Sequence, residues 1–474
     1  MVGMGRLRCG VVVLALAGAA GSGVAAQPAA TPALGRLVER VACAASPAHT
    51  YTLFLPASYT PERAWPLLFV FDPRGRATAA AEIFKPGAER FGWIIISSND
   101  TRSDTEEDLN GPAIRALWVE ALRYSVDERR VYMAAFSGLV NSAWAVAANT
   151  GRVAGIIAAG GRVHPDVYGR TMTAAFFGAA GLQDFNFLQM KMLDGVLARR
   201  GADTRRLEFF EGQHGWLPAP LAEEGMAWLE IVAMAEKRRA LEPALVAERL
   251  AADRQAAEDL ERAGRLLEAA RRFEAIARTY DALQDVTFAL ARAKALTERR
   301  DVARARDDER RWDEWEARTV QRGQALLQVV PDPDMFPSVG RVASELRLAE
   351  LHRQAARKDY AAGAAQRVLG TFFVDASYYQ WRAAMREGAA TRALFLQRVA
   401  LEIDAEAPSA WYRLALTAAT AGDKRQALEA LERAEKLGFA AADLVEGEEA
   451  FAKLRGEARY QQVLTRMRER AKAP

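Results

Sequence analysis

Short apolar runs alternate with longer amphipathic segments along the first half of the chain, as far as about residue 240. The runs that we expect to form strands lie at 49–56, 67–71, 93–97, 131–136, 155–160, 173–178 and 206–210. The segments that we expect to form helices lie at 112–124, 140–149 and 187–200. Apolar runs that alternate with helices are typical of parallel strands covered on both faces. The pattern therefore predicts an α/β domain with a mostly parallel sheet.

The pattern changes beyond about residue 240. Ala, Leu, Glu and Arg dominate, strand-like runs vanish, and the apolar spacing becomes helical. A chain of 474 residues is also too long for one ordinary core. We therefore expect an α/β domain at 46–240 and an all-α domain at 241–474.

Two stretches of the second half repeat one spacing of a glycine, a small residue and two further apolar residues. They are Gly264, Ala269, Phe273 and Ile276, and Gly422, Ala427, Leu431 and Ala434. A turn glycine followed by a small residue at a helix crossing suits paired antiparallel helices. This half resembles tetratricopeptide repeats, most clearly at 408–438 and also at 249–280. A plain helical bundle is the alternative.

A densely charged segment lies at 301–322 and contains Trp312 and Trp315. Charge runs of this kind usually form a solvated helix face. We therefore interpret the segment as a solvated face rather than a site.

The first residues have the pattern of a targeting signal. Two arginines precede an apolar run at 10–20, and small residues end at Ala26. We expect a signal peptide at 1–26, cleaved after Ala26, and a lead-in at 27–45. The apolar run is too short to span a bilayer comfortably, so no membrane span is expected after cleavage, although an uncleaved anchor is the alternative. The predicted location is the periplasm or the medium.

Charge and cysteine content give no indication of nucleic-acid binding, of binding to an anionic membrane or of an internal disulfide. The 64 basic and 61 acidic residues give a net charge of +3, which indicates neither nucleic acid nor an anionic membrane as a partner. Of the two cysteines, Cys9 lies in the predicted leader. The remaining thiol, Cys43, would have no partner for an internal disulfide.

The strand at 131–136 leads directly into Ser137 and Gly138, and then into a helix. A nucleophile elbow needs these parts in this order, because the tight turn exposes the serine hydroxyl at the carboxyl end of the strand. A serine after a strand is also a common helix N-cap, so this position alone does not decide. Ala135 and Leu139 stand where an elbow usually has glycines.

Acyl transfer by serine also needs a base and a carboxylate that orients it. The chain has four histidines, and His214 follows the last predicted strand of the first half, between glycines. Asp184 follows the strand before it, while His164 lies on a loop and is a weaker candidate base. Ser137, Asp184 and His214 thus follow three strand ends, which meet at one edge of a parallel sheet.

Residues from about 50 to 235 resemble the α/β-hydrolase superfamily, in particular its esterase, polyhydroxybutyrate-depolymerase-like and dienelactone-hydrolase-like branch. The segments that carry the resemblance are Phe69-Val70-Phe71-Asp72-Pro73-Arg74-Gly75, Ala135-Phe136-Ser137-Gly138, Gly181-Leu182-Gln183-Asp184-Phe185-Asn186 and Gly212-Gln213-His214-Gly215-Trp216. Ser, Asp and His also occur in the chain order of that superfamily. The resemblance implies Ser137 as nucleophile, His214 as general base and then acid, and Asp184 as the residue that orients His214.

The resemblance also implies an oxyanion hole, a pair of N–H donors for the negatively charged oxygen. The first donor would be the Gly138 N–H. The second would come from the loop after Phe71, where we expect Arg74 because Pro73 has no N–H.

The sequence thus predicts an exported serine hydrolase, most simply a carboxylic ester hydrolase that forms an acyl-enzyme. Its substrate would be a small-molecule or polymeric ester, with a thioester, amide or lactone as alternatives. The helical domain would bind substrate or a protein or peptide partner. No metal-ligand cluster or cofactor fingerprint stands out, so we expect neither. The alternative is an exported scaffold whose helical repeats bind a protein or peptide and whose hydrolase domain is silent.

Overall fold

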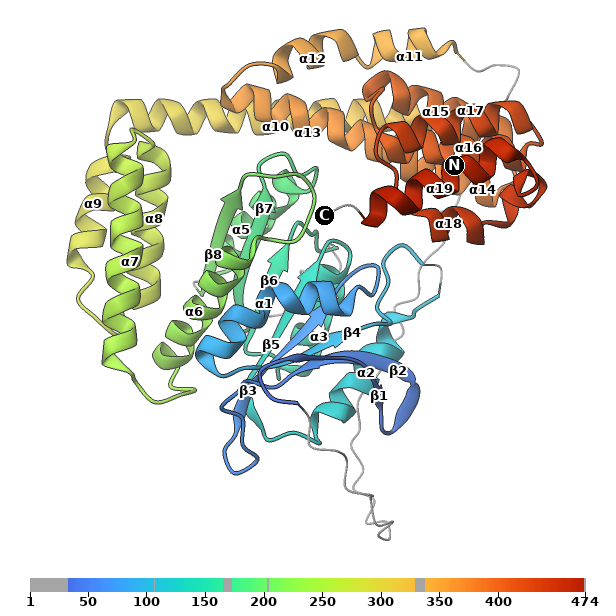
Figure 1. The fold of residues 1–474 in the computed structure, drawn as a ribbon. Helices are drawn as coiled ribbons and strands as arrows, with labels where there is room; N and C mark the ends of the chain where they lie inside the picture. The colour runs from blue at the N-terminus through green and yellow to red at the C-terminus, as the bar shows by residue number, and fades with distance from the viewer. Residues whose placement is uncertain (1–32, 106, 165–172, 203, 329–336, 473–474) are drawn as a thin grey trace.

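The computed structural model describes residues 33–105, 107–164, 173–202, 204–328 and 337–472. Its first part contains an eight-stranded sheet in the order β1-β2-β4-β3-β5-β6-β7-β8 (Figure 1). The strands are β1 Leu37–Cys43, β2 Ser46–Phe54, β3 Trp65–Phe71, β4 Ile94–Ser98, β5 Val126–Phe136, β6 Gly155–Ala159, β7 Ala175–Gly181 and β8 Arg205–Phe210. Strands β3 to β8 are parallel, whereas β1 and β2 are antiparallel to their neighbours. The predicted class, a mostly parallel α/β sheet followed by a helical region, is confirmed.

Helices cover both faces of the sheet. They are α1 Ala77–Phe91, α2 Asn110–Ala121, α3 Leu139–Thr150, α5 Phe187–Arg199 and α6 Ala219–Ala235. Along β3, Phe69 and Phe71 join the core that includes α2, α3 and α5, while Leu68 and Val70 join the core that includes α1 and α6. Burial on both faces explains why β3 is a continuous apolar run in the sequence.

Strand β1 lies within the stretch expected as a lead-in. It pairs with β2, and its register shifts between Val38 and Val41. Arg40, inside this irregularity, has a left-handed φ of 51°. The bulge interrupts the alternation of polar and apolar positions, so the sequence pattern does not indicate a strand here.

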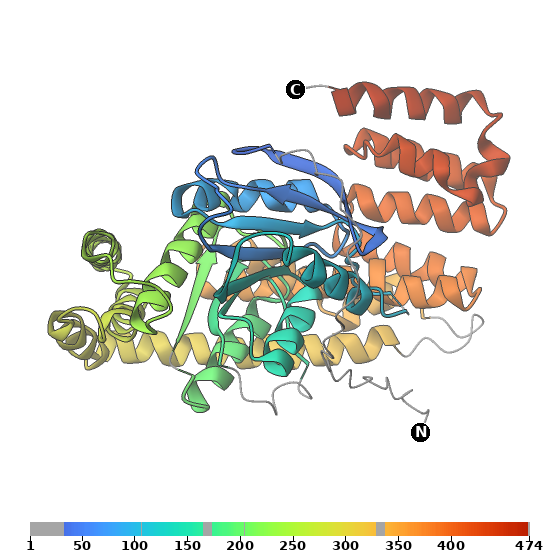
Figure 2. The same ribbon diagram turned by 90° about the horizontal axis from the view of Figure 1, so that it is seen from below.

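The second part of the described chain is helical. The helices are α7 Pro243–Arg262, α8 Leu266–Tyr280, α9 Thr287–Thr297, α10 Arg300–Gln328, α11 Val339–Glu345, α12 Leu348–Ala355, α13 Tyr360–Val374, α14 Trp381–Arg386, α15 Ala390–Ile403, α16 Pro408–Thr420, α17 Lys424–Lys436, α18 Ala442–Gly447 and α19 Ala458–Lys472. A π-helical turn, η2, spans Asp375–Gln380, and a 3-10 turn, η3, spans Glu449–Leu454. Helix α10 runs from the α7–α9 group to the C-terminal helices, so the helical part arches over the sheet (Figure 1). Figure 2 shows the C-terminal helices stacked beside the α/β part.

The two stretches with the repeated spacing both form packed helix pairs. Gly264 lies between α7 and α8 with a φ of 74°, and Gly422 lies between α16 and α17 with a φ of 83°. The small residues that follow, Ala269 and Ala427, are fully buried. These features agree with paired helices, and the assignment to tetratricopeptide repeats stays a prediction.

The α/β and helical parts share one apolar core near residue 240. Ile231 and Met234 of α6 pack in the same cluster as Val246 of α7 and Phe273 of α8. The predicted boundary therefore crosses a continuous core, so α6 and the α7–α9 group stabilise each other.

A network of buried charges joins the same elements. The Arg272 guanidinium of α8 lies 2.6 Å from Glu224 of α6 and 2.9 Å from Asp253 of α7. Arg206 of β8 lies 3.4 Å from the same Asp253 carboxylate. Burial alone would raise the pKa of Asp253, but Arg206 and Arg272 outweigh it and lower the pKa below its usual value. The carboxylates of the network are therefore ionised at neutral pH, and they bind the helical part to the last strand.

The predicted signal peptide lies outside the described residues. Within the ranges given above, no helix combines the length and apolar character needed to cross a membrane.

We expect Arg272→Met to lower the free energy of unfolding by about 3 kcal/mol at neutral pH, because it removes one of the two guanidinium groups that neutralise Asp253 and Glu224 and leaves only Arg206 beside them. The pKa values of Asp253 and Glu224 are lowered in the fold, so their contribution is present above the unfolded values and lost as pH falls. The variant should therefore lose less stability than the natural protein between neutral and acidic pH in chemical unfolding.

The matched control is Arg262→Met, because Arg262 pairs with Asp259 on the exposed surface of α7, where both side chains are more than half exposed. Arg262→Met should lower the free energy of unfolding by less than about 1 kcal/mol. Equal losses in the two variants would contradict the role assigned to the buried network.

Candidate active site

Ser137 occupies the turn between β5 and α3. Its φ is 56°, in the left-handed region that residues other than glycine rarely adopt. Such strain costs about 1–3 kcal/mol and persists where the surroundings fix the backbone. Here the Ser137 N–H donates to the Ala159 carbonyl of β6 at 2.9 Å. The turn therefore has the strained backbone expected of an elbow.

The space that the serine turn needs is provided by a glycine after the neighbouring strand, β6. Leu139, which stands where an elbow usually has glycine, is fully buried in the core on its own side of the sheet. Gly161 follows β6, and a Cβ there would lie 2.3 Å from Val140 Cγ2 and 2.8 Å from the Ser137 carbonyl. The close approach of α3 therefore depends on Gly161 instead of on residue 139.

The structure brings the three predicted site residues together. His214 Nε2 lies 3.0 Å from Ser137 Oγ, and His214 Nδ1 lies 2.9 Å from Asp184 Oδ1. The Asp184 side chain is fully buried, while the His214 side chain is 21% exposed and Ser137 is half-buried. The hydrogen-bonded series therefore runs from a buried carboxylate to a hydroxyl that solvent can reach.

Two residues that the sequence analysis missed hold Asp184 in place. The Asn186 backbone N–H donates to Asp184 Oδ1 at 2.7 Å, and the Asn186 side chain donates to the Gly160 carbonyl at 2.8 Å. Gly160 has a φ of 47°, and a Cβ on it would lie 2.3 Å from Asp184 Oδ2. The signal for Gly160 was the glycine pair Gly160-Gly161 at the end of the strand expected at 155–160.

Aromatic rings and an anchored indole position His214. Its ring centroid lies 4.7 Å from that of Phe136 and 4.2 Å from that of Phe185. On the same loop, the Trp216 indole N–H donates to Asp72 Oδ2 at 2.9 Å. Burial alone would raise the pKa of Asp72, but hydrogen bonds from Arg76, Trp216 and the Arg74 N–H lower it. The ionised carboxylate after β3 thus fixes the loop that carries His214.

The two predicted oxyanion donors differ in their surroundings. Gly138 is exposed at the N-terminus of α3, and its N–H has no acceptor among the residues that the structure describes. The Arg74 N–H instead donates to Asp72 Oδ1 at 2.8 Å. Gly138 is therefore free to bind an oxyanion, whereas Arg74 as second donor stays a prediction that requires this hydrogen bond to be released or shared.

The helical part contacts the loop that carries Asp184. Arg367 of α13 donates from Nη1 to the Leu182 carbonyl at 3.0 Å, and its guanidinium lies 4.1 Å from the Phe187 ring centroid. Arg367 is almost fully buried and pairs with Glu316 of α10 at 2.7 Å. The charged segment at 301–322, interpreted as a solvated face, therefore directs Glu316 inward. Through Arg367, Glu316 supports the loop that carries Asp184.

A second connection lies at the same interface. Lys191 of α5 donates to Asp313 of α10 at 2.6 Å and to the Tyr360 hydroxyl of α13 at 2.9 Å. Asp313 also belongs to the segment interpreted as solvated. Helix α5, which follows the Asp184 loop, is thus fixed to α10 and α13 by charge-assisted hydrogen bonds.

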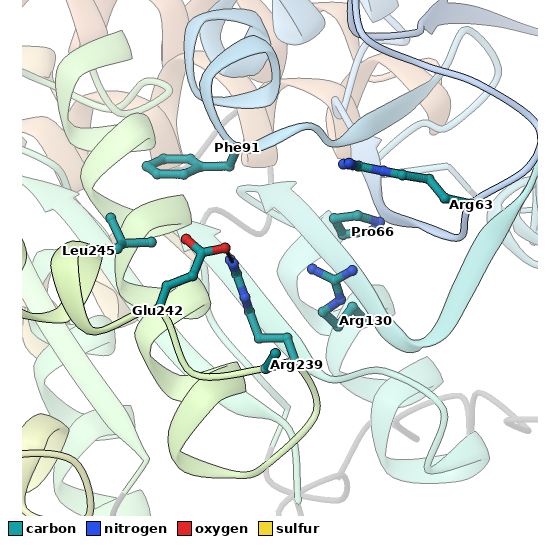
Figure 3. A pocket seen from close by; sticks show the side chains of 8 residues that line it. Arg63, Pro66, Phe91, Arg130, Arg239, Glu242 and Leu245 are labelled. Carbon is teal, nitrogen blue, oxygen red and sulfur yellow. Dashed lines mark hydrogen bonds and ion pairs between the residues drawn. The ribbon is translucent and has the colours of Figure 1, made fainter.

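A pocket lies at the opposite end of the sheet (Figure 3). Pro66 is the second residue of β3 and Arg130 precedes the apolar half of β5, so this pocket is remote from Ser137. Arg239 pairs there with Glu230 and Glu242, and Arg130 pairs with Asp127. Two of its three arginines are thus neutralised within the fold, and the third, Arg63, stacks on the Trp65 ring with its guanidinium 3.5 Å from the ring centroid. Across the described ranges, no group of three or more His, Cys, Asp or Glu side chains is placed to hold a metal ion.

The arrangement can activate a serine hydroxyl. His214 Nε2 can accept the Ser137 proton while Asp184 stabilises the imidazolium that forms. The adjacent Gly138 N–H points from a helix N-terminus, where partial positive charge favours an anion. These groups suit nucleophilic attack on a carbonyl carbon.

No family model and no curated protein matches this chain. Among solved structures, it is similar to a thermostable esterase (15% identity, TM-score 0.33), covering 41% of this chain and 62% of that protein. It is also similar to a ferulic acid esterase (15% identity, TM-score 0.33; 41% and 97% covered). An S-formylglutathione hydrolase from Staphylococcus aureus gives 12% identity and a TM-score of 0.33, with 42% and 99% covered. At these scores the likeness assigns neither substrate nor activity to this chain.

We expect Gly160→Ala to displace Asp184 and break its hydrogen bond to His214. Without an oriented histidine, labelling of Ser137 by a fluorophosphonate probe should slow by roughly a thousandfold or more. The labelling rate and the melting temperature are measured together.

Gly151→Ala is the control, because Gly151 also has a positive φ, of 62°, but open space around its missing side chain. It carries the same backbone strain, about 1 kcal/mol, without touching the site. Similar labelling rates in the two variants would show that Gly160 does not position Asp184.

Proposed function

We propose that this protein is an exported serine hydrolase that acts on carboxylic esters. The proposal rests on one observation, the continuous hydrogen-bonded series from Ser137 through His214 to Asp184. The strained turn at Ser137 and the free Gly138 N–H support it.

In the proposed reaction, His214 Nε2 accepts the hydroxyl proton as Ser137 Oγ attacks the ester carbonyl carbon. The carbonyl oxygen becomes an oxyanion, which the Gly138 N–H stabilises. The protonated His214 then donates to the leaving alcohol, and an acyl-enzyme on Ser137 Oγ remains.

A water molecule completes the cycle. His214 accepts a proton from the water as its oxygen attacks the acyl carbon, and it returns that proton to Ser137 Oγ when the acid leaves. Asp184 keeps the Nδ1–H of His214 directed toward itself in both halves of the reaction. Thioesters, amides and lactones present the same carbonyl carbon, so they remain alternative substrates.

The proposed location is the periplasm or the medium, because of the signal-peptide pattern at residues 1–26. The proposed role of the helical part is to bind substrate, or a protein or peptide partner. Its contacts with the Asp184 loop favour a direct contribution to the site.

The second candidate is a scaffold with a silent hydrolase domain. One observation favours it: the Arg74 N–H is occupied by Asp72, so one predicted oxyanion donor is engaged. Loss of one such donor costs about a hundredfold or more in rate. A silent domain would still place Ser137 beside His214, so only reactivity separates the two candidates.

We expect Ser137→Ala and His214→Ala each to remove nearly all hydrolysis of a short activated ester. The double variant should be little worse than either single variant, because members of one catalytic unit lose activity non-additively. The measurement is kcat/KM for para-nitrophenyl butyrate.

His164→Ala is the control, since His164 is the weaker candidate base, and it should leave kcat/KM unchanged. Undiminished turnover in Ser137→Ala would move the nucleophile elsewhere. Failure of the folded natural protein to react with a fluorophosphonate probe would favour the scaffold.

A further inference from the structure

The loops after β3 and β4 lie beside the serine turn. The Ser103 N–H, after β4, donates to the Pro73 carbonyl, after β3, at 3.0 Å. A Cβ on Gly138 would lie 2.9 Å from Ser103 Cβ, so this loop pair borders the proposed oxyanion position. The exposed side chains of these two loops therefore face any substrate bound at Ser137.

The helical part reaches this border through Tyr378, in the π-helical turn η2. The Tyr378 hydroxyl lies 3.4 Å from Asp104 Oδ2, on the loop after β4, and accepts from Arg382 Nη1 at 2.9 Å. The guanidinium of Arg413, in α16, lies 5.5 Å from the Tyr378 ring centroid. Short π-helical turns often occur at functional sites.

Arg413 is a half-buried cation without a carboxylate partner in the described part of the chain. Its guanidinium lies near two aromatic rings, 5.7 Å from the Trp381 ring centroid and 5.5 Å from that of Tyr378. The Trp381 indole N–H donates to Thr417 Oγ1 at 2.8 Å, which fixes this ring. Arg413 is thus held in place by packing and not by an ion pair.

A second arginine adds to the positive charge at the same place. Burial lowers the pKa of Arg413, and the charge of Arg74, on the exposed loop after β3, lowers it further. The two guanidinium groups belong to different halves of the chain, and their like charges repel each other. An anion that binds between them would offset both the repulsion and the desolvation.

The nearby carboxylates do not fill this role. Asp104 accepts from the Ser103 hydroxyl at 3.1 Å in addition to its contact with Tyr378. Asp72 is paired with Arg76 at 2.8 Å. Burial raises the pKa of Asp375, at the start of η2, and hydrogen bonding to Gln324 and the charge of Arg162 offset part of this rise. Asp375 forms no ion pair with Arg413 among the described residues.

We infer that Arg74, Arg382 and Arg413, here named the arginine cluster, bind an anionic group of the ester substrate. The inference rests on the proposed function and adds a substrate class, esters that carry a carboxylate or phosphate besides the bond that is cleaved. Guanidinium groups recognise both anions by paired hydrogen bonds. Because the cluster joins the two halves of the chain, the helical part becomes the specificity-determining part of the site.

The anion lies either on the acyl side or on the alcohol side of the ester. Mono-para-nitrophenyl glutarate and para-nitrophenyl valerate, its neutral analogue of the same chain length, test the acyl side. Para-acetoxybenzoate and neutral para-acetoxytoluene test the alcohol side. For each pair, the readout is the ratio of kcat/KM for the anionic ester to that for the neutral ester.

In the natural protein we expect one of the two ratios to exceed about 10, as one charge-assisted contact gives roughly ten- to hundredfold. Arg413→Gln should bring that ratio close to unity, and Arg413→Lys should restore part of it by keeping the charge. Arg425→Gln is the control, because Arg425 is exposed on α17 and pairs with Glu429. It should leave the ratio unchanged.

The outcomes separate the inference from the proposed function. Hydrolysis of the neutral esters with no preference for either anionic ester overturns the inference alone, as does a ratio that Arg413→Gln does not alter. Hydrolysis of none of the four esters overturns the proposed function. In that case calorimetric binding of glutarate decides: binding that Arg413→Gln weakens at least tenfold supports the anion site, and no binding overturns it.

Discussion

The close approach of the β6 end to the serine turn is the constraint on which the candidate site depends. Gly160 lets the Asp184 carboxylate lie against the backbone, and Gly161 admits α3 and the turn that carries Ser137. A parallel sheet brings such ends together because its strands finish at one edge. Once these strand ends are in contact, short loops suffice to place His214 between the other two side chains.

Buried polar interactions, in addition to the shared apolar core, define how the helical part meets the α/β part. The buried Arg367–Glu316 pair contacts the Leu182 carbonyl, and Arg272 joins carboxylates of both parts. Buried ion pairs contribute little net stability compared with apolar packing, but a misplaced partner is costly. They therefore select one docking position from the many that helices rich in alanine and leucine would accept.

The sequence predicted the central strands and the three site residues because both depend on local pattern. Continuous apolar runs identify strands, and the loops that follow three of these runs contain Ser137, Asp184 and His214. Helix α1 was missed because Pro86 and Gly87 interrupt its pattern. The inward turn of Glu316 and the unpaired Arg413 depend on residues distant in the chain, so periodicity cannot reveal them.

The contact between Arg367 and Leu182 has a consequence for the timing of folding. The two residues are separated by 185 positions, so the support behind the Asp184 loop is synthesised long after the loop itself. Contacts of such separation form late, because the intervening chain must first be ordered. During synthesis, the strands of the sheet are therefore complete before the loop that carries Asp184 becomes rigid. Full assembly of the site therefore requires that synthesis has passed α13.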